Sequence, residues 1–273
     1  MSKYMKNFIE FEYHRVTNEN FTEIWQAKKP SRVVITVPHD GIPNYKWPDK
    51  IRDRRKSVTG GDPQVWLIAK DVLFSSRRLR IREFISVVRG NIPRGVVDLN
   101  RSWPFPRSYC VGQKPQLALE NPRYASVYRQ YHGLIKKLLM DSIESYGKEG
   151  CLLVDLHGFG KQPDYAPKNG YDLILGTGNR ASIYYDDIDF KMGEYLRSKG
   201  YEVFVPRDKS SSHKKEDLYA AEFTTRYWAE RLKINAVQIE TAHKFRDKKR
   251  GVEIGPQLSK DLASFFEKWF FGK

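Results

Sequence analysis

The sequence predicts an α/β fold, with a mixed, mostly parallel sheet and helices on both faces. Short apolar runs of strand length alternate along the chain with longer amphipathic segments, a pattern typical of strand–helix–strand crossovers. The run Cys151–Asp155 is almost wholly apolar and ends abruptly in polar residues, as in a strand buried on both faces. A chain of 273 residues can bury a full core. We therefore expect residues 1–273 to form a single domain, with residues 1–30 as an N-terminal extension packed on the core.

The remaining elements follow from periodicity and from residues typical of helix ends. Asp62 followed by Pro63 is typical of a helix start, with an acid at the N-cap and proline at the first helical position. Further helices are expected over residues 122–146, 187–198, 224–232 and 255–270. Strands are expected over residues 32–38, 83–88, 96–101, 151–155, 171–178, 202–206 and 235–240.

Composition argues against several classes of protein. No apolar run approaches the roughly 20 residues of a membrane span. The first eight residues lack the apolar core of a signal peptide. The two cysteines, Cys110 and Cys151, form neither a disulfide framework nor a CxxC pair. These features predict a cytoplasmic protein without a membrane segment.

The formal net charge of +15 raises the question of an acidic partner. Nucleic acid and a small anionic substrate are two explanations, and a generally basic proteome is a third. The basic residues are scattered, with local clusters at 52–56, 77–82 and 244–250, and no RNA-binding signature or zinc-finger spacing accompanies them. Charge alone therefore supports the binding of a polyanion only weakly. A basic nucleic-acid-binding protein is the alternative outside the enzymes, and its mark would be steeply salt-dependent binding.

Several predicted strands end in residues that can bind a metal or catalyse a reaction. The carboxyl ends of parallel strands converge on one edge of a sheet, where open α/β sheets place their ligands. Two imidazoles and one carboxylate leave a coordination position open for water, which is typical of a catalytic zinc. A further carboxylate nearby could then act as general base. The strand ends in question carry His39 with Asp40, Asn100 with Arg101, Asp155 with His157, and Glu240.

Asp155 and His157 form the most informative of these strand ends. They are two residues apart, so in an extended strand both side chains project from the same face. The carboxylate could orient the imidazole or share a metal with it, and we favour an orienting role.

The order of the motifs carries a resemblance to a known family. The motifs are the histidine at 39, Asp-Leu-Asn-Arg at 98–101, Tyr-His at 131–132, Asp-Leu-His at 155–157, Leu-Gly-Thr at 175–177 and Gln-Ile-Glu at 238–240. Over about residues 31–245 this order resembles the N-formylglutamate amidohydrolase family, whose wider relatives are the zinc carboxypeptidases and the aspartoacylase/succinylglutamate desuccinylase group. The resemblance implies a zinc carboxypeptidase-like fold and a Zn²⁺-dependent hydrolase that cleaves a C–N amide bond of an N-acyl, carboxylate-bearing substrate. A carboxypeptidase-like or γ-glutamyl/cell-wall peptidase is the alternative.

The resemblance also implies a set of metal ligands. His39 and His157 match the two zinc-binding histidines. The carboxypeptidase relatives have a glutamate three residues after the first histidine, where this chain has Ile42. The formylglutamate branch instead has an acid at the start of the following helix, which matches Asp62. Asp40 is the competing candidate, and we prefer Asp62.

The remaining roles are carried over in the same way. Asn100 and Arg101 match the pair that grips a substrate carboxylate, and the guanidinium fork suits that geometry or could steady an oxyanion. Glu240 matches the general base. This chain departs from the family pattern in two ways: Asp40 replaces a small residue, and the net charge is unusually basic. Both departures affect the identity of the substrate more than the reaction that is expected.

Three other features have ordinary explanations. His132, in the middle of a predicted helix, is expected to be packed or hydrogen-bonded. His243 is expected to lie outside the pocket. The arginines at 52, 54 and 55 are expected to form a solvated charge run.

Overall fold

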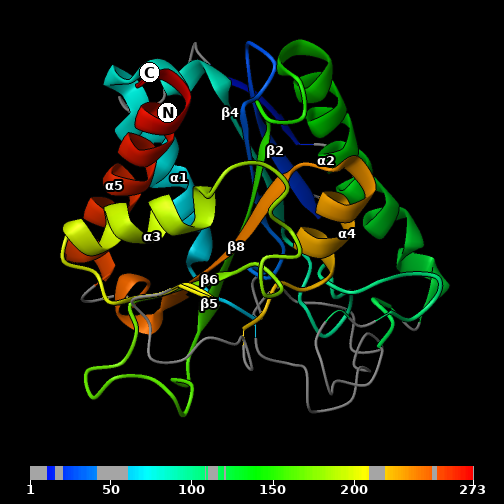
Figure 1. The fold of residues 1–273 in the computed structure, drawn as a ribbon. Coiled ribbons are helices and arrows are strands. Elements are labelled where there is room, and N and C mark those ends of the chain that lie inside the picture. Colours follow the sequence, from blue (N-terminus) through cyan, green and yellow to red (C-terminus); the bar gives the residue numbers. More distant parts are fainter. Residues whose placement is uncertain are drawn as a thin grey trace.

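Strands and helices alternate along the chain, and the strands form one sheet (Figure 1). The computed structural model describes residues 11–15, 21–41, 61–107, 109, 116–119, 121–208, 219–247 and 251–272. Within these residues the sheet has the strand order β1-β2-β4-β3-β5-β8-β6-β7. The strands are β1 (Phe11–Arg15), β2 (Thr22–Ala27), β3 (Val33–Val37), β4 (Ile85–Gly90), β5 (Leu152–Phe159), β6 (Leu173–Gly176), β7 (Val203–Phe204) and β8 (Asn235–Ala242).

The centre of the sheet is parallel and its flanks are partly antiparallel. Strands β4, β3, β5 and β8 are neighbours and run in the same direction. On one side β2 pairs antiparallel with β4, and β1 pairs antiparallel with β2. On the other side β6 is antiparallel to β8, and β7 is parallel to β6. The predicted fold class, a mixed and mostly parallel sheet, is therefore confirmed.

Helices cover both faces of the sheet, as predicted (Figure 1). Helices α1 (Val65–Ser75), α3 (Ile188–Ser198) and α5 (Gly251–Phe271) lie on one face, and α2 (Ala125–Tyr146) and α4 (Phe223–Leu232) on the other. Short 3-10 helices occur at Ser76–Arg78, Arg80–Phe84, Pro122–Tyr124 and His243–Phe245. Among the described residues, none of the helices combines the length and the apolar character needed to cross a membrane.

Strand β3 shows how the sequence builds two cores. Successive side chains of a strand point to opposite faces. Val33 and Ile35 pack into the core beneath α1, α3 and α5, and Val34 packs into the core beneath α2 and α4. Because both faces are covered, the strand is buried at every position rather than at alternate ones.

The predicted strand over residues 96–101 is wrong. This segment is a series of turns, in which Val96 N donates to Pro93 O and Asp98 N donates to Ala118 O (2.8 and 2.7 Å). Val97 and Leu99 are fully buried in the core beneath α2 and α4. Their alternation with polar residues reflects this packing of a loop and not strand pairing.

The predicted start of the first helix is also wrong. Helix α1 begins at Val65, after Gln64 in the left-handed region (φ 70°), and not at Asp62. The carboxylate of Asp40 accepts hydrogen bonds from the backbone N–H groups of Gln64 and Trp66. Asp40 therefore stabilises the start of the helix, and the side chain of Asp62 is left for another role.

Two strands within the first 30 residues were not predicted. The structure places β1 and β2 there, paired with each other and joined to the sheet through β4. Strand β2 carries Glu23, whose carboxylate pairs with Arg89 of β4 at 3.1 Å. A buried charge of this kind interrupts the apolar pattern by which strands are recognised.

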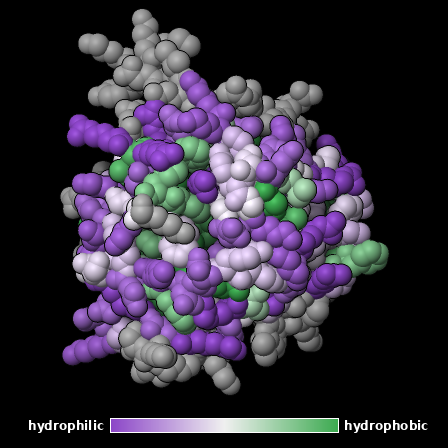
Figure 2. All heavy atoms as spheres, turned by 45° about the horizontal axis from the view of Figure 1, so that its top comes forward, coloured by the Kyte–Doolittle hydropathy of each residue, from purple (hydrophilic) through white to green (hydrophobic). Residues whose placement is uncertain are grey.

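Figure 2 is turned so that the upper end of the molecule in Figure 1 comes forward, and the surface in this view is mostly hydrophilic with separate hydrophobic patches. The upper end lies at the amino-terminal ends of the parallel strands. Aromatic rings and charged groups lie together here, as where the guanidinium of Arg32 stacks 4.0 Å from the ring centroid of Tyr146. The polar strand ends lie at the opposite edge of the sheet.

Candidate active site

Three neighbouring parallel strands bring polar side chains to one edge of the sheet. His39 follows β3, and His157 lies in β5 directly opposite Glu240 of β8. Because β3, β5 and β8 are adjacent and parallel, their carboxyl ends meet, as predicted for these three strands. Asn100 and Arg101 reach the same edge from a loop and not from a strand.

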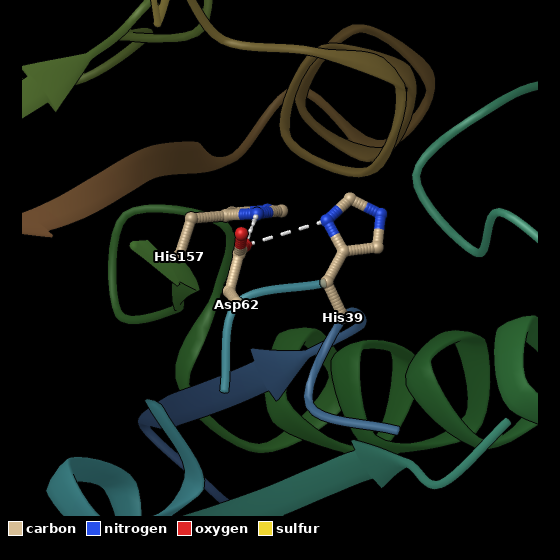
Figure 3. Close-up of side chains that lie close together, drawn as sticks. All are labelled: His39, Asp62 and His157. Carbon is tan, nitrogen blue, oxygen red and sulfur yellow. Dashed lines mark hydrogen bonds and ion pairs between the residues drawn. The ribbon is translucent and has the colours of Figure 1, made fainter. Parts of the chain in front are cut away.

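His39, Asp62 and His157 converge on one point (Figure 3). Asp62 Oδ2 lies 3.0 Å from His157 Nδ1 and 3.4 Å from His39 Nδ1. All three residues are buried, and their candidate ligand atoms lie within 4.8 Å of one another. The structure thus brings Asp62, and not Asp40, to the two histidines.

The backbone around Asp62 explains how it reaches the histidines. Asp62 N donates a hydrogen bond to His39 O at 2.9 Å, which joins two segments that are far apart in sequence. Gly61 permits this approach, because a Cβ at this position would lie 2.8 Å from the same carbonyl oxygen. A larger residue at position 61 would push Asp62 away from His39.

Each histidine is oriented by a second carboxylate behind it. His39 Nε2 lies 2.7 Å from Asp98 Oδ1, and His157 Nε2 lies 3.1 Å from Asp155 Oδ2. Both rings therefore turn Nδ1 toward Asp62. Such pairing is typical of metal-binding histidines, because it sets the tautomer and the direction of the ligating nitrogen.

The donor set fits a metal ion. His39 Nδ1 is buried and makes no hydrogen bond to any described residue, although burial of an unpaired polar atom is unfavourable. Two imidazole nitrogens and one carboxylate oxygen form the three-ligand set of a catalytic zinc, with a position left open. A metal at this point would satisfy the orphaned nitrogen.

The acids of the centre are held in their charged forms. Burial raises the pKa of Asp62, but the hydrogen bond from His157 and the charges of His39 and His157 outweigh it and bring the pKa below the usual range. Burial likewise raises the pKa of Asp98, and the charges of Arg94 and His39 lower it well below its usual value. Carboxylates that bind a metal, or that orient its histidine ligands, act as anions, so this charge state suits a cation site.

Glu240 differs from these acids. Its side chain is buried, and this burial raises its pKa to about 8, against the opposing charge of His157. Gln238 Nε2 donates a hydrogen bond to Glu240 Oε1 at 3.0 Å, which fixes the carboxylate beside His157. A carboxyl group whose pKa lies near neutrality can both accept and return a proton.

Arg101 and Asn100 are held tightly at the same edge. Arg101 Nη1 donates to Glu222 Oε2 (2.7 Å) and to the backbone oxygen of Asn100 (3.0 Å). Asn100 is buried, and its Oδ1 accepts a hydrogen bond from Thr224 N at 2.8 Å. Its Nδ2 lies 3.2 Å from His157 Nε2. Asn100 therefore links the Arg101 loop to helix α4.

Replacing Asp155 by asparagine is expected to weaken metal affinity by about 10- to 100-fold. Asp155 accepts a hydrogen bond from Thr36 Oγ1 (2.6 Å), which asparagine can retain through its oxygen, but the charge behind His157 is lost. Metal titration followed by calorimetry measures the change. The control is Asp189→Asn. Asp189 is a buried acid that pairs with Arg180 and is not part of the centre, so this variant is expected to bind metal as tightly as wild type does. Equal affinities in Asp155→Asn and wild type would contradict an orienting role.

The comparisons with known proteins agree with this geometry. The family model of N-formylglutamate amidohydrolase matches residues 31–245, which is most of the chain. The chain belongs to this family. It is accordingly a hydrolase, of the amidohydrolase class.

Solved structures show the same fold. An N-formylglutamate amidohydrolase from Ralstonia eutropha is similar with a TM-score of 0.60 and 17% identity, over 91% of this chain and 96% of that one. A gene product from Agrobacterium tumefaciens is similar with a TM-score of 0.51 and 14% identity, over 91% of this chain and 92% of that one. No curated protein sequence matches this chain.

This member of the amidohydrolase family also uses arginines that the sequence did not indicate. Arg94 Nε donates to Asp98 Oδ2 at 3.0 Å, so it supports the acid behind His39. Arg246 Nη2 donates to Phe159 O at 2.9 Å, and Gly158 makes room for its guanidinium, which a Cβ would approach to 2.2 Å. The spacing of four residues between Arg94 and Asp98 is the one local feature that indicates their pairing. Arg246 lies within the basic cluster 244–250, and nothing in that cluster distinguishes it from its neighbours.

Other predicted residues lie where they contact the centre indirectly or not at all. Asp40 pairs with Arg89 at 2.7 Å instead of facing the histidines. His132 is buried with Nε2 3.0 Å from Leu99 O, so the prediction of a hydrogen-bonded histidine is confirmed. The side chain of His243 is 63% exposed. The arginines at 52, 54 and 55 lie outside the described residues.

Proposed function

We propose that this amidohydrolase is zinc-dependent and cleaves the C–N amide bond of an N-acyl substrate that carries a carboxylate, as N-formylglutamate does. One observation carries the proposal: two buried histidine nitrogens and the Asp62 carboxylate converge beside Glu240. The family match supports the amide as the bond that is cleaved.

His39, Asp62 and His157 would hold the Zn²⁺ ion, through Nδ1 of each imidazole and a carboxylate oxygen. When bound, zinc polarises the scissile carbonyl and lowers the pKa of an attacking water. Asp98 and Asp155 keep the two rings turned toward this point, because each carboxylate contacts the Nε2 atom on the far side of its histidine.

Glu240 is the proposed general base. Its carboxylate takes a proton from the attacking water and returns it to the leaving nitrogen, so that the amine departs neutral. Gln238 holds the carboxylate in place through one oxygen and leaves the other free for this exchange. A positioned acid–base group of this kind typically contributes about 10²–10⁴ in rate.

Arg101, supported by Asn100, is the proposed anchor of the substrate. A guanidinium at the edge of the site can hold a substrate carboxylate or steady the oxyanion that develops on the carbonyl. The backbone oxygen of Asn100 accepts a hydrogen bond from Arg101 Nη1, which limits the guanidinium to one direction. The basic chain, with its formal charge of +15, attracts such an anionic substrate over short distances.

The test is the hydrolysis of N-formyl-L-glutamate by the purified chain, before and after chelation. We expect turnover to fall to background when the metal is removed and to return when zinc is added. Short peptides with a free terminal carboxylate form a second arm, and faster cleavage of these would favour the peptidase alternative. Turnover that persists in metal-free protein would contradict the zinc mechanism. Steeply salt-dependent binding of DNA or RNA without hydrolysis would favour a nucleic-acid-binding protein.

A further inference from the structure

The proposed substrate anchor, Arg101, is already paired with an acid of the same chain. Glu222 Oε2 accepts a hydrogen bond from Arg101 Nη1 at 2.7 Å. The two side chains are 12% and 15% exposed, so water screens the pair only weakly. Arg101 Nη1 also donates to Asn100 O, and both hydrogens of this nitrogen are therefore in use.

The backbone of Glu222 is fixed from two directions. Its N–H donates to Gln238 Oε1 at 3.1 Å, and the same glutamine donates through Nε2 to the general base Glu240. Two residues further on, Thr224 N donates to Asn100 Oδ1. The backbone around Glu222 is thus held in place by Gln238 of β8 and by Asn100. The Arg101–Glu222 pair therefore differs from an exposed ion pair between flexible side chains.

We propose that Glu222 is a specificity-determining residue. It accepts the hydrogen bond of Arg101 Nη1 that a substrate carboxylate would otherwise receive. This inference rests on the proposed function, because it takes Arg101 as the anchor of the substrate. A substrate carboxylate has to displace Glu222 or share its guanidinium. The apparent dissociation constant rises in proportion as the fraction of free Arg101 falls. The site therefore binds carboxylate-bearing amides more weakly than it would if Arg101 were unpaired. It also discriminates less strongly against uncharged amides.

Removing the charge of Glu222 separates this role from a merely structural one. Glu222→Gln keeps the length of the side chain and an oxygen that can accept from Arg101. We expect KM for N-formyl-L-glutamate to fall about tenfold with kcat unchanged. KM for the matching diamide, in which both carboxylates are carboxamides, is expected to stay the same. A structural role would instead lower kcat or raise KM for both substrates.

Glu230→Gln is the matched control, because Glu230 lies in α4, the helix that Glu222 immediately precedes, and also pairs with an arginine, Arg226, at 2.8 Å. A readout independent of turnover is the binding of glutarate to the zinc-loaded chain, measured by calorimetry. We expect glutarate to bind Glu222→Gln about tenfold more tightly than wild type, and Glu230→Gln like wild type.

Equal or weaker glutarate binding by Glu222→Gln would overturn the inference, as would the same gain in Glu230→Gln. The proposed function fails separately, if wild-type protein turns over none of the amide substrates. Glutarate binding still decides the role of Glu222 in that case, because it requires no reaction.

Discussion

Replacing Glu240 by glutamine is expected to lower turnover by a factor of about 10²–10⁴ while the protein keeps its metal. Glutamine has the same shape but cannot take a proton from water. Glu240 is not among the three residues that converge on the metal position, so the ligand set stays intact. The measurement is kcat for N-formyl-L-glutamate, together with the zinc content of the same sample.

The fold should tolerate this change. The oxygen of a glutamine at position 240 can still accept the hydrogen bond from Gln238 Nε2, and the residue stays within β8. Glu83→Gln makes the same substitution at an acid that is 53% exposed and paired with Lys29, and it is expected to leave turnover unchanged. Full activity in Glu240→Gln would remove Glu240 from the mechanism.

Removing either histidine of the centre is expected to abolish both zinc binding and hydrolysis. His39→Ala and His157→Ala each leave two ligands where a catalytic zinc needs three from the protein. We expect zinc content to fall from about one ion per chain to a small fraction of that, and hydrolysis to fall to background. Zinc is measured by mass spectrometry after gel filtration, on samples whose fold is checked by circular dichroism.

The two variants also lose contacts that stabilise the fold. Asp98 loses its contact with His39 in His39→Ala but keeps the hydrogen bond from Arg94. Asp155 loses its contact with His157 in His157→Ala but keeps the hydrogen bond from Thr36. Loss of one hydrogen bond to a buried charged group destabilises a fold by about 1.5–3 kcal/mol. His243→Ala, at an exposed histidine, is the control and is expected to retain zinc and activity. A folded His39→Ala or His157→Ala protein that keeps one zinc per chain would show that the ion binds elsewhere.

Much of the centre could be predicted because it depends on strand ends. Strands β3, β5 and β8 are buried along almost their whole length, and each has a polar residue in or just after its carboxyl-terminal part: His39, His157 or Glu240. Parallel strands necessarily bring such ends together. Asp62 could be predicted as a metal ligand only through the family resemblance. Its neighbours in the sequence predicted a helix N-cap, which the structure does not show.

The rest depends on contacts between distant residues, which local patterns do not record. Arg101 and Glu222 are 121 positions apart, and neither predicts the other. The error at residues 96–101 has a different origin. Val97 and Leu99 alternate with polar residues as a strand would, but they do so because a loop packs them on α2. Over a segment as short as residues 96–101, a buried loop and a paired strand can therefore show the same alternation of apolar and polar residues.

The central claim is that His39, Asp62 and His157 together hold a catalytic zinc ion. Anomalous diffraction from zinc-loaded crystals, at the zinc absorption edge, tests it most directly. We expect one strong peak within bonding distance of Nδ1 of both histidines and of the Asp62 carboxylate. A peak at Asp40 instead of Asp62, or no peak between the two histidines, would contradict it.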